Sequence, residues 1–310
     1  MNPVITDIES VFKKYRMAPT AVDLYEQVGK ELLLQKIEGF VGQGKPISFV
    51  MLGFPMKSPN NRDKVLGTMP DKGEELALKN LLKLNREVKQ IYEPGVTVNI
   101  VSDGYAFSDV MEVPDTTVEA YNEASYSIVK GGPVEWYDLR DFYGNHKTIS
   151  SMRTSMVNQF GITETELERR IQFDTDVNYL YRGMIKFLEL DIAIRNYSSN
   201  SMLHKQAKKL AREMMFRNEA YSHLVSEEFN RSIRLSIHQS INNGKKYSFQ
   251  LLPSPKAWTT PWHSAMVMEQ DGTWNTIHKR DAERLGYRLV TDGGQPYYYE
   301  QVREVFMYQD

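Results

Sequence analysis

The chain has 310 residues, with 38 Lys and Arg, 40 Asp and Glu, and no cysteine. The lack of cysteine excludes disulfide scaffolds, Cys-ligated zinc sites, iron–sulfur clusters and thiol nucleophiles. A net charge of −2 provides no broad positive field, so we expect no nucleic-acid partner.

The N-terminal segment has early acidic residues and no apolar core, which argues against a secretory signal or a transit peptide. The longest strongly apolar stretch, residues 47–56, is too short to span a bilayer and contains Gly53 and Pro55. We therefore expect a cytoplasmic protein without membrane association.

The first half of the chain alternates between predicted helices and strands. Continuous apolar runs are typical of strands covered on both faces of a parallel sheet, whereas apolar residues at regular four- and five-residue steps indicate helices. We expect helices at 22–41, 73–92 and 115–130, and strands at 46–53, 96–101 and 134–139. This order indicates βαβ units and therefore an α/β fold with a Rossmann-like sheet core.

The second half of the chain is predicted to contain a helical region followed by a region of strands. Residues 146–229 are predicted to be mostly helical, and strands at 232–238 and 247–252 follow, with a hairpin formed by 264–269 and 273–278. We expect one domain, 1–310, with the Rossmann-like core at about 20–145, an inserted helical region at about 146–230 and C-terminal strands at about 231–310.

Polar loops follow the first two predicted strands, where an open α/β sheet binds its ligands. In the first loop, Lys57 could bind a phosphate or a carboxylate as a point charge, and Arg62 could do so bidentately. The second loop begins with Ser102, Asp103 and Gly104, where Asp103 could bind an ammonium group or act as a base. The alternatives are a rigid surface loop and an ordinary Asp-Gly turn.

Two of the six histidines stand out. His238 ends the predicted strand 232–238 and Arg234 lies four residues earlier, so an extended strand would place both side chains on one face. Such a pair combines a fixed cation with a group that titrates near neutrality, which suits phosphate binding and proton transfer. His263 follows Trp258 and Trp262, which could form a pocket wall. Either histidine could instead be a satisfied core or edge residue.

Several established motifs are absent from the sequence. It contains no Walker loop, no Gly-x-Gly-x-x-Gly after a strand and no His-Glu-x-x-His, so neither a nucleotide cofactor nor a metal is expected. Arg217 and Tyr221 share one helix face and are weaker candidates for substrate contact. Asp71, Glu74 and Glu75, at the start of the second helix, are explained by the helix dipole.

Taken together, these segments resemble the isonitrile (isocyanide) synthases of the pyoverdine/dityrosine biosynthesis family. One departure is Met56, where a small residue, often Ala, is expected; it could narrow the adjoining pocket. The matching segments run in order over most of the chain: Phe54-Pro55-Met56-Lys57-Ser58-Pro59-Asn60, Lys64-Val65-Leu66-Gly67, Pro70-Asp71-Lys72-Gly73-Glu74-Glu75, Ser102-Asp103-Gly104, Phe107-Ser108-Asp109, Arg217-Asn218-Glu219-Ala220-Tyr221-Ser222, Ile233-Arg234-Leu235-Ser236-Ile237-His238 and Thr260-Pro261-Trp262-His263.

The resemblance implies an enzyme that condenses the α-amine of L-tyrosine or L-tryptophan with ribulose 5-phosphate. The C2 carbon of the sugar becomes the isonitrile carbon, and the amino acid keeps its carboxylate. No redox cofactor or metal is implied for this step. The implied pathway partner is an oxygenase that depends on iron(II) and 2-oxoglutarate.

On this basis we assign four catalytic residues, Lys57, Asp103, His238 and His263. Lys57 and Arg234 are expected to hold the sugar phosphate, the two histidines to act as general acid and base, and Asp103 to orient the amine. The expected substrate-binding residues are Arg234, Arg62, Ser102, Arg217 and Tyr221. The alternatives are a non-catalytic binding protein for an aromatic amino acid or a sugar phosphate, and a helix-rich interaction module, which would leave the convergent loops unexplained.

Overall fold

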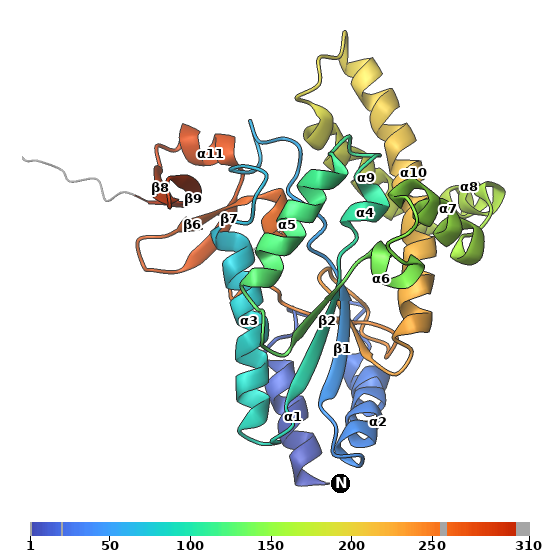
Figure 1. Ribbon diagram of the computed structural model, residues 1–310, viewed down its shortest axis with the longest axis vertical. Helices are drawn as coiled ribbons and strands as arrows, with labels where there is room; N and C mark the ends of the chain where they lie inside the picture. Colours follow the sequence, from blue (N-terminus) through green and yellow to red (C-terminus); the bar gives the residue numbers. More distant parts are fainter. Residues whose placement is uncertain (1, 20, 255–258, 302–310) are drawn as a thin grey trace, which may run out of the picture.

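A computed structural model describes residues 2–19, 21–254 and 259–301. At its centre is a parallel five-stranded sheet with the strand order β3-β2-β1-β4-β5 (Figure 1). The strands are β1 (Ile47–Leu52), β2 (Val96–Val101), β3 (Val134–Tyr137), β4 (Ile233–Ser236) and β5 (Tyr247–Ser248). The predicted α/β fold with a parallel core is therefore confirmed.

The central strands are apolar because both faces of the sheet are covered. In β1, Phe49 and Met51 belong to one buried core, and the intervening Val50 belongs to a second core on the other face. Since successive side chains of a strand point to opposite faces, such a strand needs apolar residues at consecutive positions. This requirement explains the continuous apolar runs in the sequence.

Four of the described α-helices contribute to the first core: α1 (Pro3–Lys13), α2 (Lys30–Val41), α3 (Lys72–Lys89) and, through Tyr121, α5 (Asp115–Ser127). The helix expected at 22–41 begins later and differently, with a π-helical segment over Tyr25–Gly29 that leads into α2. The chain before it is held out of the helix, because the backbone N–H of Leu24 donates to the Ile241 carbonyl.

The inserted helical region forms the second core, and Figure 1 shows its 29-residue helix α10 on the opposite side of the sheet from α3. The prediction that residues 146–229 are mostly helical is confirmed. The helices that follow β2 and β3 are α4 (Gly104–Phe107), α5 (Asp115–Ser127), α6 (Leu139–Tyr143), α7 (Ile149–Phe160), α8 (Glu164–Phe173), α9 (Thr175–Ile192) and α10 (Asn200–Glu228).

A second, mixed sheet has the order β7-β6-β9-β8 and lies beside the first (Figure 1). The predicted hairpin is confirmed as β6 (Ala265–Met268) and β7 (Trp274–Ile277), with Gly272 at φ +79° in its turn. We did not predict the second hairpin, although Gly293 and Gly294 in its turn both have positive φ. The remaining elements are the 3₁₀ turn η2 (Pro261–His263), α11 (Lys279–Arg284), β8 (Arg288–Asp292) and β9 (Gln295–Glu300).

The first two strands after the helical region do not form a separate C-terminal unit. Both β4 and β5 join the central sheet, where β4 pairs with β1. They are also shorter than expected: β4 ends at Ser236 and β5 contains two residues. The amide of Phe249 still donates to the Ser236 carbonyl of β4, but the amide of Gln250 donates to the Tyr15 carbonyl, and there the chain leaves the sheet.

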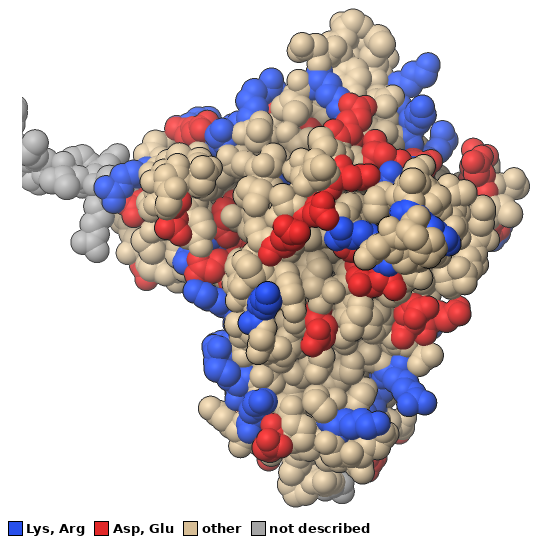
Figure 2. All heavy atoms as spheres, viewed as in Figure 1, with Lys and Arg blue, Asp and Glu red and all other residues tan. Residues whose placement is uncertain are grey.

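The charged surface is mixed in sign. Figure 2 shows Lys and Arg side chains interspersed with Asp and Glu over the face in view. None of the described helices is both long and apolar enough to cross a membrane.

Candidate active site

A cavity of about 450 Å³ lies beyond the carboxyl ends of β1, β2 and β4. Helices α9 and α10 and the turn η2 close it, so all three regions of the chain contribute to its walls. This is the position at which an open α/β sheet binds ligands. Its lining residues from the central sheet and its loops include Gly53, Pro55, Met56, Ser58, Asp103, Phe107, Met111, Ile237 and His238.

The walls of this cavity are largely apolar. Helix α9 contributes Tyr179, Leu180, Met184 and Phe187, and η2 contributes Trp262. Met56, the unusual residue of the first loop, is buried and also lines the cavity. Aromatic and methionine side chains of this kind suit a flat apolar group such as a phenol or indole ring.

Asp103 places a carboxyl group in this apolar cavity. It lies directly after β2, and its Oδ1 is buried without a hydrogen-bond partner among the described residues. Burial raises the pKa of Asp103 to about 7. The carboxyl group can therefore both accept and release a proton near neutral pH.

His238 and His263 lie on the same cavity as Asp103. Burial, together with the charges of Lys64 and His238, lowers the pKa of His263 far below its ordinary value. The ring of His263 packs edge-on against Phe187, with 4.4 Å between ring centroids. Its Nδ1 is buried without a partner in the described part of the chain. The ring is therefore neutral at pH 7, with one nitrogen available to a ligand.

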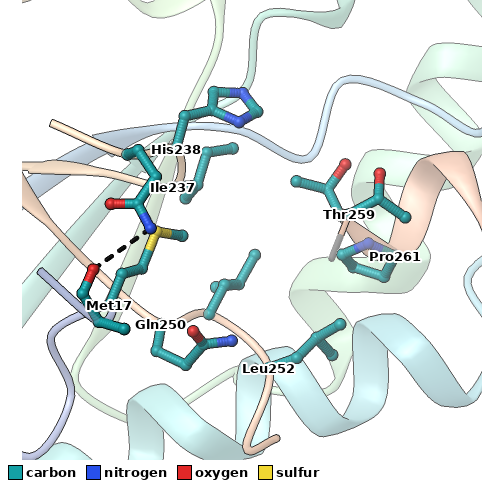
Figure 3. A pocket seen from close by; sticks show the side chains of 11 residues that line it. Met17, Ile237, His238, Gln250, Leu252, Thr259 and Pro261 are labelled. Carbon is teal, nitrogen blue, oxygen red and sulfur yellow. Dashed lines mark hydrogen bonds between the residues drawn. The ribbon is translucent and has the colours of Figure 1, made fainter. Parts of the chain in front are cut away.

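His238 also borders a second cavity of about 410 Å³, shown in Figure 3. Ile237, Thr259 and Thr260 line both cavities, whereas Gln250 lines only the second. His238 is exposed at the mouth of the cavities, yet the protein atoms around its ring displace water, and this loss of hydration, followed by the charge of Lys246, lowers the pKa of His238. His238 thus lies where two adjoining spaces meet and remains mostly neutral at pH 7.

Lys57 belongs to the lining of the cavity, but its ammonium group is engaged by other residues. It is completely buried, with its Nζ 2.7 Å from Asp71 Oδ2, 2.8 Å from Glu74 Oε2 and 3.1 Å from the Pro261 carbonyl. Burial opposes its charge, but the two carboxylates outweigh burial and raise the pKa of Lys57. We call Lys57, Asp71 and Glu74 the Lys57 cluster.

The Lys57 cluster joins the loop after β1 to the turn that carries His263. Asp71 and Glu74 form the capping box of α3, and Lys57 adds the bond to Pro261, two residues before His263. These contacts argue against a phosphate at Lys57, because its ammonium already faces two carboxylates. We expected the helix dipole to explain Asp71 and Glu74, but both carboxylates also pair with Lys57.

A second buried ion pair, not foreseen from the sequence, lies next to the cavity. Lys64 Nζ is 2.5 Å from Asp191 Oδ1 and 4.1 Å from the centre of the Phe187 ring. Ser58 donates to the same carboxylate oxygen. Lys64 could have been identified from the sequence, because it belongs to one of the segments that resemble the family. Asp191 lies within a helix, and no sequence feature pointed to it.

Five predicted substrate-binding residues do not line either cavity. Arg62 is exposed and pairs with Asp63 at 3.0 Å. Ser102 and Tyr221 are buried, and the Tyr221 hydroxyl donates to the Ser102 carbonyl at 2.7 Å. Arg217 donates to Asp109, with distances of 2.6 and 3.0 Å. These contacts give the four residues structural roles at the edge of the site.

Arg234 is the fifth of these residues, and its environment differs. Its guanidinium bonds Ser222 and Ser226 of α10 on the face of the sheet opposite the first core. Since β4 ends at Ser236, the period-two argument that paired Arg234 with His238 does not extend to His238.

Within the described ranges, no group of three or more His, Asp or Glu residues could hold a metal ion. Trp258, one of the tryptophans considered for a pocket wall, lies outside the described residues. The described lining of the cavity offers one carboxyl group and two imidazoles for proton transfer.

Comparisons with known proteins agree with this architecture. A model of the pyoverdine/dityrosine biosynthesis protein family matches residues 37–290. The chain is 33% identical over 271 residues to the L-tryptophan isonitrile synthase AmbI2 of Fischerella ambigua, which covers 86% of this chain and 81% of that protein. It is 28% identical over 295 residues to the L-tyrosine isonitrile synthase of Pseudomonas aeruginosa, covering 93% and 89%. The crystal structure of PvcA from Pseudomonas aeruginosa matches with a TM-score of 0.90 at 27% identity, covering 96% of this chain and all of that one.

Proposed function

Because the chain belongs to the pyoverdine/dityrosine biosynthesis protein family, we propose that it is an isonitrile synthase. Its substrates are an aromatic L-amino acid, L-tyrosine or L-tryptophan, and ribulose 5-phosphate. The α-amine condenses with the sugar ketone, and C2 of the sugar becomes the isonitrile carbon. The relatives named for L-tryptophan and L-tyrosine support the amino-acid class.

The observation that carries this proposal is the combination of an apolar cavity with three proton-transfer groups. The aromatic ring of the amino acid fits between Phe187, Met184 and Trp262. Asp103 then faces the α-amine, which must lose a proton before its nitrogen can attack a carbonyl carbon. A carboxyl group with a pKa of about 7 suits that task, because it is partly ionised at neutral pH.

The two histidines suit the later steps. Imine formation and the following C–H, C–O and C–C bond cleavages each move a proton. His238 borders both cavities, so it can serve a second substrate that enters beside the amino acid. His263 offers its unpaired Nδ1 to the same space. We propose that these steps need no redox cofactor or metal, and that an iron(II)- and 2-oxoglutarate-dependent oxygenase consumes the product.

The proposal is tested by measuring isonitrile formation directly. Purified protein is incubated with ribulose 5-phosphate and each aromatic amino acid, and the isonitrile is detected by its infrared stretch or as a trapped tetrazine adduct. We expect product with at least one amino acid and its loss in His238→Ala and His263→Ala. Absence of product from folded wild-type protein with every aromatic amino acid would refute the proposal.

The second candidate is a non-catalytic binding protein with the same cavity. It predicts that an aromatic amino acid or the sugar phosphate binds in calorimetry without any isonitrile being formed. The unpaired Asp103 and His263 atoms favour the enzyme, because a binding site gains from satisfying its buried polar groups.

A further inference from the structure

The described residues include four buried Lys or Arg side chains, and one of them lacks an acidic partner. Lys57, Lys64 and Arg153 each contact a carboxylate, at 2.7, 2.5 and 2.9 Å. Arg234 is 8% exposed, and its guanidinium donates to the Ser226 hydroxyl and to the hydroxyl and carbonyl of Ser222. A buried guanidinium without a counter-ion is costly, so an anion would stabilise it.

A second cation lies beside Arg234. Leu235 pairs with Tyr247 in the parallel register of β4 and β5, and Lys246 is the residue directly before β5. The positive charge of Arg234 acts on the Lys246 ammonium group, so the two cations lie near each other. Leu235 and Tyr247 face the first core, whereas Arg234 faces α10. Lys246 is exposed and forms no ion pair with the described residues. Glu219 of α10, whose charge acts on Lys246, pairs instead with Arg170 at 3.2 Å.

Hydroxyl groups surround this pair of cations. Ser222 and Ser226 come from α10, and Ser248 is the next residue of β5 on the same face. The Ser248 hydroxyl is completely buried and has no hydrogen-bond partner in the described part of the chain. Cations with several hydroxyl donors are the usual surroundings of a bound phosphate group.

Neither cavity supplies such a site. The second cavity is lined by no Lys or Arg residue, and the one in the first cavity's lining is Lys57, whose side chain is 0% exposed. A phosphorylated substrate at His238 therefore needs cations from a neighbouring element. Arg234 lies four residues before His238, within about 13 Å of extended chain.

We propose that Arg234 and Lys246, with Ser222, Ser226 and Ser248, bind the phosphate group of the sugar-phosphate substrate. This inference rests on the proposed function, because it names the site for one substrate of that reaction. The sequence-based prediction assigned the phosphate to Lys57 and Arg234; this proposal keeps Arg234 and replaces Lys57, which holds the turn of His263, by Lys246 at the exposed edge of the central sheet. The carbonyl end of the sugar then extends toward His238.

The test compares Lys246→Met with Lys245→Met. Both changes remove one positive charge from adjacent exposed residues, but it is Lys246 whose ammonium group lies within reach of the charge of Arg234. We expect Lys246→Met to raise KM for ribulose 5-phosphate at least tenfold and to weaken inhibition by inorganic phosphate, while KM for the amino acid changes little. Lys245→Met should match the wild type. Equal KM values for the sugar phosphate in both variants would overturn the proposal.

Direct binding separates this inference from the proposed function. Calorimetric titration with ribulose 5-phosphate and with inorganic phosphate needs no turnover, so it is decisive even if no isonitrile forms. We expect weaker binding in Lys246→Met and in Arg234→Met, with Lys245→Met unchanged. If Arg234→Met does not fold, because it loses its contacts with α10, the exposed Lys246 still decides the question. Isonitrile formation with unaltered phosphate binding in Lys246→Met would refute the site and retain the function.

Discussion

At the scale of single residues, burial decides what each charged group can do. Asp103 and Asp71 have the same side chain and both have a pKa of about 7, but for different reasons. Burial alone raises the pKa of Asp103, which has no cation beside it among the described residues. Burial also raises the pKa of Asp71, although the positive charge of Lys57, 2.7 Å away, acts to lower it. Asp103 is thus available to a substrate, whereas Asp71 is already used to hold Lys57.

We predict that Asp103→Asn lowers kcat/KM by roughly 10²- to 10⁴-fold, the usual contribution of a general base. In the wild type, kcat/KM should fall as the pH drops below about 7, because protonation removes the base. This acidic limb should be missing from the residual activity of the variant. The measurement is the pH dependence of kcat/KM. An unchanged acidic limb in the variant would exclude Asp103 as the titrating group.

The same substitution provides its own folding control. The folded pKa of Asp103 is raised, so between about pH 4 and pH 7 the folded chain keeps a proton that the unfolded chain releases. Wild-type stability therefore falls through this window as the pH rises. The Tm of Asp103→Asn minus the Tm of the wild type should therefore be larger at pH 8 than at pH 5. A variant less stable at pH 8 would show that the carboxylate has an unrecognised partner.

We predict that Lys57→Met destabilises the fold by about 3–5 kcal/mol, because it leaves Asp71 and Glu74 buried without their cation. The loss should be larger at pH 8 than at pH 5, since burial raises the pKa of Asp71 to about 7 and this group is therefore ionised mainly at the higher pH. Chemical denaturation measures both effects. The matched control is Lys79→Met, whose exposed pair with Glu75 is worth at most about 1 kcal/mol.

Rescue gives a further check on the Lys57 cluster. In the Lys57→Met background, Asp71→Asn removes one unpaired charge and should recover part of the lost stability. If Lys57→Met alone proves as stable as the wild type, the cluster does not hold the turn of His263.

At the scale of elements, the site depends on how closely the loops after β1 and β2 approach each other. Gly104 begins α4 immediately after Asp103. A Cβ atom at this position would lie 2.1 Å from the Pro55 carbonyl oxygen and 2.6 Å from Val118. Only glycine therefore allows α4 to pack against the first loop and to bring Asp103 to the cavity.

We predict that Gly104→Ala lowers stability by more than 2 kcal/mol and reduces turnover, because backbone atoms must move to relieve the clash. Gly39→Ala is the matched control. Gly39 lies inside α2, and apart from its neighbours in the helix no described atom comes within 4 Å of the added methyl group, so the variant should gain about 0.5–1 kcal/mol of stability. Thermal unfolding and initial rates measure both. Equal stability of the two variants would contradict the close packing at Gly104.

At the scale of the whole molecule, the main cavity exists only when distant parts of the chain meet. The first half contributes the loops after β1 and β2, the inserted helices contribute α9 and α10, and the C-terminal part contributes His238 and η2. The Lys57 cluster joins the first and last of these parts across more than 180 residues.

We predict that an aromatic amino acid slows amide hydrogen exchange in all of these parts together. The measurement is exchange with and without saturating L-tyrosine or L-tryptophan, followed by mass spectrometry. Helix α8, which does not line the cavity, serves as the internal control. Protection confined to one part would show that the ligand binds elsewhere. The peptides expected to respond cover residues 53–59, 103–111, 179–187, 237–238 and 259–263.

The sequence alone determined the α/β class, the three strands of the first half, the helical region and the main loops of the site. These features follow from local physics, because a strand buried on both faces must be apolar throughout and a helix must show its own period. The family-like segments also lie in the sequence itself, which is why Asp103, His238 and His263 were identified as candidates.

Only the tertiary structure decided which charges face the cavity and which satisfy one another. Lys57 looked like a ligand for phosphate, yet it is enclosed by two carboxylates from a helix start. Lys246 carried no signal until β5 joined the central sheet beside Arg234. Whether two charges pair depends on the distance between residues that are far apart in the chain, and burial changes the strength of the pair severalfold. Local patterns in the sequence therefore do not reveal which charges pair.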